Sequence, residues 1–146
     1  MGLLSDLGGG PVALDTSIFI YFIEEHPRYL PLVEPLFKAM DAGELEAVTS
    51  SLTLIEVLVI PFRFANAALV ARYETLLTKS RGLRLIDLDR DFLRSVAQVR
   101  ASTRAKTPDA MQLAAAMAAS CPVLLTNDDR IPKVPGLRTL LLEDYL

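Results

Sequence analysis

The sequence predicts an α/β fold in which a parallel sheet is covered by helices on both faces. The main observation is that short apolar runs alternate with longer amphipathic stretches along the chain, as in proteins with parallel sheets. The 146 residues, 51% hydrophobic and 23% charged, suit one packed domain and exclude intrinsic disorder as the main state. We predict a flexible lead-in over residues 1–10, containing Gly8 to Gly10, and a single domain over 11–146.

Five short apolar runs are predicted to be buried strands, because each is rich in aliphatic residues and most stop at a polar residue. They cover residues 12–14, 47–49, 83–86, 123–125 and 137–142. The carboxyl ends of parallel strands meet at one edge of the sheet, where such folds bind ligands. The residues that end each run are therefore the first candidates for a functional site.

Longer amphipathic stretches between these runs are predicted to be helices. Gly43 and Pro61 mark the ends of two of them, and Thr107-Pro108 marks the start of another. The predicted helices cover residues 28–42, 52–60, 65–80, 90–104 and 108–119.

The uncharged stretch Ala110–Asn127 is interpreted as a buried helix followed by a buried strand, not as a membrane span. The chain begins without the basic start and apolar stretch of a signal peptide. We therefore expect a cytoplasmic protein without membrane association.

Composition excludes several kinds of chemistry. Cys121 and His26 are the only residues of their types, so the chain has no intrachain disulfide, thiolate cluster or multi-histidine metal site. The net charge of −3 argues against a protein that coats nucleic acid non-specifically, so a nucleic-acid role requires a local basic patch.

Acidic residues lie at the predicted strand ends and helix starts. Asp15 and Asp128 follow strands, Glu56 lies in the helix after the second strand, and Asp109 begins the alanine-rich helix. Taken singly, each has a structural explanation as a helix cap, a capping box or a polar turn. Glu56 fits such a role least, because its aliphatic neighbours predict that the carboxylate lies near buried surface.

Taken together, the four acidic residues predict one acidic pocket. Crowded carboxylates repel each other, and a hard divalent cation with oxygen ligands relieves that repulsion. Mg²⁺ in such a pocket binds a phosphate oxygen and activates a water molecule, so no histidine base is required. The composition therefore favours a metal-dependent phosphodiesterase over acyl-transfer or thiol chemistry.

Four segments also resemble the ordered motifs of PIN-domain nucleases. They are Leu14–Tyr21, Ser50–Leu58, Thr107–Ala116 and Leu125–Asp128, and their order and spacing agree over roughly residues 11–142. The short single-domain format is similar to that of VapC-type toxins from toxin–antitoxin pairs. The resemblance implies a three-layer α/β/α sandwich with Rossmann-like topology and Mg²⁺- or Mn²⁺-dependent cleavage of RNA. It also implies a homodimer and a cognate antitoxin encoded next door that blocks the pocket.

The resemblance assigns roles to individual residues. Its catalytic and metal-binding acids correspond to Asp15, Glu56, Asp109 and Asp128, with Asp129 as the alternative for the fourth acid. Thr16, Ser17 and Thr126 are expected to hold the acidic ligands, metal waters or phosphate by hydrogen bonds, or else to act only in capping and strand termination.

Basic and aromatic residues leave two interpretations open. Arg100, Arg104 and Lys106 either meet RNA phosphates beside the acidic centre or form a solvated helix face. Two apolar clusters belong to the core or to a groove for a second copy or an antitoxin; they are Phe19, Tyr21, Phe22 and Ile23, and Phe62 and Phe64.

Two other functions compete with the nuclease hypothesis. The first is a catalytically inactive PIN module that binds RNA or a partner protein. The second is a phospho-acceptor receiver domain, which requires paired acids at the first strand and a lysine after the last. Only Asp15 follows the first strand, and no lysine follows Lys133, so the receiver hypothesis is disfavoured.

Overall fold

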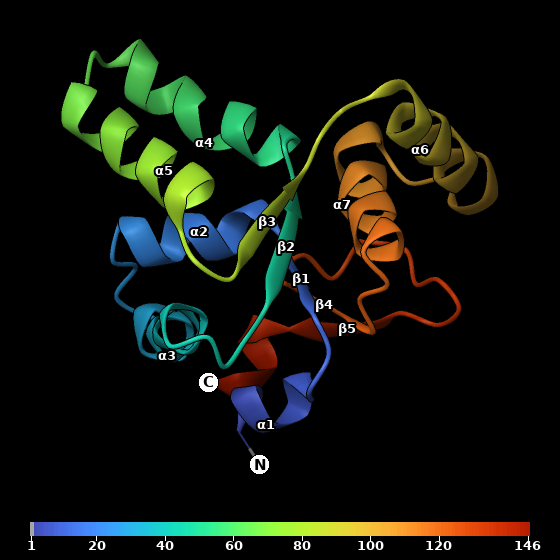
Figure 1. Ribbon diagram of the computed structural model, residues 1–146, viewed down its shortest axis with the longest axis horizontal. Helices are drawn as coiled ribbons and strands as arrows, with labels where there is room; N and C mark the ends of the chain where they lie inside the picture. Colours follow the sequence, from blue (N-terminus) through green and yellow to red (C-terminus); the bar gives the residue numbers. More distant parts are fainter. Residues whose placement is uncertain (1) are drawn as a thin grey trace.

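The computed structural model describes residues 2–146 and contains a five-stranded parallel sheet with the strand order β3-β2-β1-β4-β5 (Figure 1). The strands are β1 (Val12–Leu14), β2 (Ala47–Ser50), β3 (Leu83–Ile86), β4 (Val123–Thr126) and β5 (Arg138–Leu141). All five predicted strands are confirmed, with shifts of one residue at most.

Seven α-helices and a terminal 3-10 turn connect these strands within the described part of the chain. They are α1 (Leu3–Leu7), α2 (Thr16–Ile23), α3 (Leu30–Asp41), α4 (Leu52–Arg63), α5 (Ala67–Lys79), α6 (Arg90–Thr103), α7 (Thr107–Ala118) and η1 (Leu142–Tyr145). The uncharged stretch Ala110–Asn127 is indeed the buried part of α7 followed by β4. In residues 2–146, no helix is long and apolar enough to cross a membrane.

The sheet separates two hydrophobic cores, which confirms the predicted three-layer arrangement. Successive residues of a strand point to opposite faces. Accordingly, Val12 and Leu14 pack into the core under α2, α3 and α5, while Ala13 packs into the core under α6 and α7. Figure 1 shows α2 to α5 on one side of the sheet and α6 and α7 on the other.

The strand order creates a switch point between β1 and β4. From β1 the chain builds outward through β2 to β3, and it then returns through α6 and α7 to place β4 on the other side of β1. Ligands in open α/β sheets bind beyond the carboxyl ends of the strands at such a point. The segments after β1 and β4, which carry Asp15 and Asp128, therefore lie where this topology favours a binding site.

The expected flexible lead-in contains a short helix that packs against the domain. Leu3 and Leu7 of α1 are buried in the larger core. The Tyr145 hydroxyl donates to Asp6 Oδ2 at 2.6 Å, which joins α1 to the C-terminal turn η1. Burial of two leucines offsets the cost of ordering this segment, a long-range effect that the glycine-rich sequence does not reveal.

Two helices differ from the prediction. The apolar run over residues 16–23 forms α2, which the sequence did not predict because nearly every position is hydrophobic and the helical period is masked. Helix α4 continues through Pro61 to Arg63 instead of ending before the proline. Pro61 is buried, and its carbonyl accepts from the Asn66 N–H at 2.8 Å, so packing and the connection to α5 outweigh the missing donor.

Candidate active site

Asp15 lies at the junction of β1 and β4 and is held by two hydrogen bonds. It caps α2, accepting from the Thr16 N–H at Oδ1 over 2.8 Å. Thr126, the last residue of β4, donates its hydroxyl to Oδ2 over 2.7 Å. The helix-cap interpretation is therefore confirmed, and the second bond also fixes the carboxylate relative to the neighbouring strand.

Asp109 and Asp128 share the electrostatic environment of Asp15. Burial raises the pKa of Asp15 above its ordinary value, and the charge of Asp128 adds to this rise against the two hydrogen bonds. Burial also raises the pKa of Asp109, and the charges of Asp128 and Asp15 raise it further. The three aspartates thus lie close enough to repel one another, as the predicted acidic pocket requires.

Asp128 is also bound to a basic neighbour. Its Oδ1 accepts from the Arg130 N–H at 2.9 Å and from Arg130 Nε at 3.0 Å, and these bonds lower the pKa of the Asp128 carboxyl. The Asp128 N–H donates to Thr126 Oγ1 at 3.1 Å. Asp128 is half-buried and acts on the other aspartates, whereas Asp129 is exposed, so the geometry favours Asp128 as the fourth acid.

Glu56 is connected to the Asp15 segment by one hydrogen bond, which the Thr16 hydroxyl donates. The Thr16 hydroxyl donates to Glu56 Oε1 at 2.6 Å, so Thr16 joins two acids through its N–H and its O–H. The carboxylate of Glu56 thus contacts the buried Thr16 hydroxyl, as expected, although the side chain as a whole and its neighbour Ile55 are exposed. The possible capping box does not form, since α4 begins at Leu52 without a side-chain cap.

A buried polar network behind these acids was missed by the sequence analysis. It consists of Thr16, Thr49, Thr53 and Gln112, which are linked by hydrogen bonds between α2, β2, α4 and α7. All four side chains are buried. A signal was present, because Gln112 is a lone polar residue in a helix of alanines one turn after Asp109.

The other predicted polar and basic residues lie in different environments. The Ser17 hydroxyl is buried without a hydrogen-bond partner among the described residues. Lys106 occupies the N-cap position of α7 without a side-chain cap, and its charge lowers the pKa of both Asp109 and Asp128.

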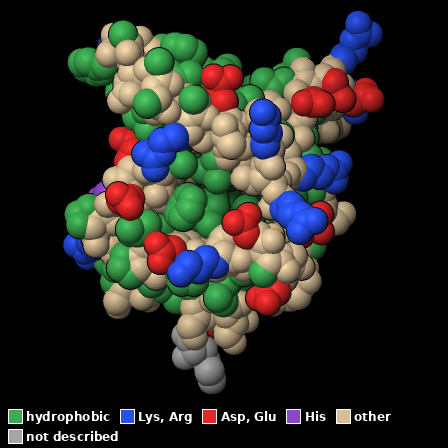
Figure 2. Space-filling view, turned by 60° about the vertical axis from the view of Figure 1, so that its left-hand side comes forward, with side chains coloured by type: hydrophobic (Ala, Val, Ile, Leu, Met, Phe, Trp, Pro, Cys, Tyr) green, Lys and Arg blue, Asp and Glu red, His purple; other side chains and the backbone are tan. Residues whose placement is uncertain are grey.

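Arg100 and Arg104 do not form the predicted helix face. Helix α6 ends at Thr103, and Arg104 turns into the left-handed conformation with φ 63°. Arg100 Nε donates to the Ala105 carbonyl at 3.1 Å. On the face drawn in Figure 2, basic and acidic side chains are interspersed, so this face presents no continuous basic tract.

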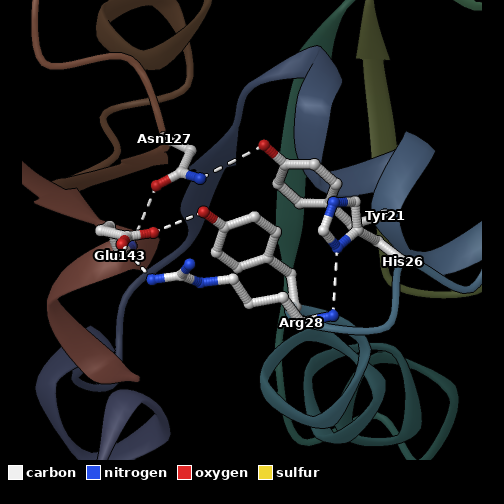
Figure 3. Close-up of polar contacts among 6 residues, drawn as sticks. Tyr21, His26, Arg28, Asn127 and Glu143 are labelled. Atoms are coloured by element: carbon white, nitrogen blue, oxygen red, sulfur yellow. Dashed lines mark hydrogen bonds and ion pairs between the residues drawn. The ribbon is translucent and has the colours of Figure 1, made fainter.

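A cluster of polar and aromatic residues holds the loop after β4 by hydrogen bonds to Asn127 (Figure 3). Asn127 Nδ2 donates to the Tyr21 hydroxyl at 3.2 Å, and Asn127 Oδ1 accepts from the Glu143 N–H at 2.9 Å. Glu143 in turn pairs with Arg28 at 2.6 Å. The cluster ties the residue before Asp128 to α2 and to the C-terminal turn, and it includes the only histidine, whose Nδ1 accepts from the Arg28 N–H.

The acids fit a hard divalent cation in chemistry but are not gathered into a coordination shell. Over residues 2–146, no three acidic, histidine or cysteine side chains lie close enough together to hold a metal ion in this arrangement. The donor set consists of carboxylate oxygens, which Mg²⁺ and Mn²⁺ prefer. The raised pKa values of Asp15 and Asp109 reflect partly buried, mutually repelling charges that a cation would relieve.

Solved structures with the same fold come from bacterial toxin–antitoxin systems. A DNA-bound VapBC complex from Salmonella typhimurium contains a chain that is 22% identical, with a TM-score of 0.69 over 91% of this chain and 98% of that chain. A toxin–antitoxin complex from Klebsiella pneumoniae is 22% identical, with a TM-score of 0.63 over 86% and 94%. VapC20 of Mycobacterium tuberculosis, a toxin that cleaves the sarcin–ricin loop, is 13% identical, with a TM-score of 0.65 over 82% and 92%.

Comparison with curated protein sequences gave no significant match. The sequence model of the PIN domain matches residues 12–137. This range contains strands β1 to β4 and all four acidic motifs. On the strength of this match over most of its length, the chain belongs to the PIN domain family.

Proposed function

We propose that the protein is a divalent-metal-dependent endoribonuclease that hydrolyses RNA phosphodiester bonds. The observation that carries this proposal is that acids from separate motifs interact near the switch point of the sheet. Asp15, Asp109 and Asp128 influence one another electrostatically, and Glu56 is linked to them by the Thr16 hydroxyl. The VapC20 fold relative, described as a toxin that cleaves the sarcin–ricin loop, supports RNA as the substrate class.

Asp15, Glu56, Asp109 and Asp128 would hold the cation, Mg²⁺ or Mn²⁺. When bound, such a cation offsets phosphate charge and lowers the pKa of a coordinated water molecule. Thr126 and Thr16 orient Asp15 from two sides, whereas the Ser17 hydroxyl is buried and lies away from solvent.

Basic side chains near the acids would hold the RNA backbone. Lys106, at the start of α7 and close to Asp109 in sequence, is a candidate for a phosphate contact because its charge acts on Asp109 and Asp128. Arg100 and Arg104 line a hollow of about 550 Å³ that also includes Thr107 at the start of α7. They would contact the backbone farther from the cleaved bond.

The protein would act as the toxin of a toxin–antitoxin pair in the cytoplasm. Its fold relatives include chains from VapBC complexes, which supports an antitoxin partner. Helix α4 presents Ile60, Phe62 and, just beyond its end, Phe64, whose side chains are 58%, 63% and 74% exposed. Such an apolar surface suits an amphipathic helix of an antitoxin. We also propose that two copies of the chain form a homodimer, independently of antitoxin binding.

A catalytically inactive PIN module that binds RNA or a partner protein is the second candidate. It is favoured by one observation, that the acids are not gathered into a coordination shell. This module would bind RNA or a protein without cutting RNA, and its binding would survive loss of the carboxylates.

Incubation of labelled structured and single-stranded RNA with the wild-type protein separates the two candidates. We expect cleavage in Mg²⁺ or Mn²⁺ and none in EDTA. RNA binding without cleavage, together with no detectable Mn²⁺ binding, would favour the inactive module.

The antitoxin part of the proposal is tested by co-purification with the product of the neighbouring gene. We expect a stable complex that Phe62→Ser weakens and that Leu4→Ser, an exposed change on α1, leaves intact. A complex unaffected by Phe62→Ser would contradict the assignment of this surface.

A further inference from the structure

Gln112 connects the helix that carries Asp109 to the segments that carry Asp15 and Glu56. It lies in α7 one turn after Asp109 and is 3% exposed. Its amide lies within hydrogen-bonding distance of Thr16 in α2, Thr53 in α4 and Ser50 at the end of β2. This side chain thus connects its own motif segment to two others, Leu14–Tyr21 and Ser50–Leu58.

The backbone fixes the orientation of this amide. The Ser50 N–H is a donor, and it lies 3.3 Å from Gln112 Oε1, so this oxygen is the acceptor. The amide nitrogen therefore faces the two hydroxyls, with Nε2 at 3.0 Å from Thr53 Oγ1 and 3.4 Å from Thr16 Oγ1. Since Nε2 carries two hydrogens, it can donate to both.

The directions of the hydroxyl protons follow from this orientation. Thr49 donates its proton to the Leu14 carbonyl at 2.8 Å, which leaves Thr49 Oγ1 as an acceptor for the Thr53 hydroxyl at 2.9 Å. Thr16 accepts from Gln112 and donates its own proton to Glu56 Oε1 at 2.6 Å. Every donor in this arrangement has an acceptor.

Exchanging the positions of Oε1 and Nε2 in the Gln112 amide would change which group accepts the Thr16 proton. If Oε1 faced Thr16, it would be a further interior acceptor for the Thr16 proton, beside Thr53 Oγ1 at 3.1 Å, and it would compete with the bond to Glu56. The Thr16 hydroxyl provides the hydrogen bond that ties the exposed Glu56 side chain to the Asp15 segment. The direction of the Thr16 proton thus decides whether Glu56 is held near Asp15.

We propose that Gln112 is a positioning residue of the acidic site, which directs the Thr16 hydroxyl toward Glu56 and so holds that carboxylate in place for the cation. Core packing alone does not explain this residue, because its neighbours Leu113 to Ala116 are apolar and buried, and a buried amide costs free energy unless it is hydrogen-bonded.

This inference rests on the proposed metal-dependent nuclease, and its first test measures Mn²⁺ binding by titration calorimetry. Gln112→Met keeps the length of the side chain and removes its polar atoms. We expect the Kd for Mn²⁺ to rise about tenfold, as for other groups that orient metal ligands. Leu113→Val is the matched control, since it also perturbs the buried face of α7 but touches none of the network, and it should leave the Kd unchanged.

RNA cleavage gives a second readout with the same variants. Gln112→Met should lower kcat about tenfold and change KM for RNA less than twofold, because the basic residues proposed to bind RNA are untouched. If Gln112→Met does not fold, the same measurements are made on Gln112→Asn. It retains the amide but withdraws it from Thr16, and it should weaken Mn²⁺ binding as well.

A double-mutant cycle identifies the route of the effect. In the Glu56→Gln background, Gln112→Met should cause no further loss of Mn²⁺ affinity, because its effect passes through Glu56. Additive losses would overturn the inference. So would an unchanged Kd in a folded Gln112→Met protein.

A crystal structure of Gln112→Met separates failure of this inference from failure of the proposed function. We expect the Thr16 hydroxyl to lie beyond hydrogen-bond distance of Glu56 in the variant, whether or not metal binds. If wild-type protein neither binds Mn²⁺ nor cleaves RNA, the proposed function fails. Independently of that result, an intact hydrogen bond between Thr16 and Glu56 in Gln112→Met would overturn the inference.

Discussion

Asp15 combines a structural and a chemical role in one side chain. It caps α2 through Oδ1 and accepts the Thr126 hydroxyl through Oδ2, while burial disfavours its charge. A cap alone would function as well on an exposed surface. The burial and the nearby Asp128 are therefore the features that distinguish Asp15 from an ordinary helix cap.

Neutralising Asp15 should stabilise the fold at neutral pH. Its folded pKa lies above the ordinary value of 3.8, so this carboxyl favours folding fully below that pH, and the benefit is lost as pH rises through the folded pKa. Asp15→Asn removes the buried charge, and we expect its Tm at pH 7 to equal or exceed that of wild type in thermal scans. The difference should shrink toward pH 4, and a clearly lower Tm at pH 7 would contradict this account.

Cys121 should be chemically inert in the folded protein. Burial raises the pKa of its thiol from 9.0 to about 11, which lowers the thiolate fraction at pH 8 about a hundredfold. We expect iodoacetamide to label native protein far more slowly than unfolded protein. The same shift predicts stability that is full below pH 9.0 and declines as pH rises toward 11. Equal labelling rates in the native and unfolded states would contradict the prediction.

At the scale of elements, local sequence patterns predicted most of the fold. Helix α7 and strand β4 followed from an uncharged stretch that begins after Thr107-Pro108, and the parallel sheet followed from strand–helix alternation. Helix α2 was missed because its apolar run masks the helical period, whereas the errors at α1 and α4 come from packing between distant segments. Helix α1 depends on contacts with the C-terminal turn, and α4 extends through Pro61 because it packs against α5.

Helix α1 offers a direct test of that packing. Leu7 is 1% exposed and Leu4 is 45% exposed in the same helix. We expect Leu7→Ala to lower the free energy of unfolding by about 3 kcal/mol, measured by urea denaturation, because it empties a filled position in the core. Leu4→Ala should cost less than about 0.5 kcal/mol. Equal small effects would mean that the N-terminal segment does not pack as described.

The candidate site was predictable in its acids but not in its supports. Asp15, Asp109 and Asp128 each follow a strand or begin a helix, which local sequence signals. The link from Thr16 to Glu56 joins residues 40 positions apart, and the bond from Thr126 to Asp15 spans 111 positions. The proton directions around Gln112 depend on the orientation of one amide, which only the three-dimensional arrangement reveals.

Over the whole molecule, charge limits how RNA can be bound. The net charge is −3, and the acidic centre itself repels phosphate, so the proposed RNA contacts depend on a few basic side chains. Lys106 is the cation closest in sequence to Asp109 and acts on its pKa. A protein with few phosphate contacts should bind RNA with a shallow salt dependence.

Removing Lys106 should change that dependence measurably. We expect Lys106→Ala to reduce the slope of log affinity against log salt by about 0.7, as for the loss of one phosphate contact on single-stranded nucleic acid. Fluorescence anisotropy with labelled RNA in EDTA measures it without cleavage. Lys38→Ala is the control, because Lys38 pairs with Glu34 on α3. An unchanged slope for Lys106→Ala would remove Lys106 from the RNA interface.

The most direct test of the acidic centre is the single-turnover rate of RNA cleavage in Mn²⁺ for three folded proteins. These are wild type, Asp15→Asn and Asp129→Asn, the last being an exposed acid outside the proposed ligand set. We predict that Asp15→Asn lowers the rate more than about a hundredfold and that Asp129→Asn changes it less than about threefold. Metal-dependent cleavage that survives in Asp15→Asn would contradict the central claim.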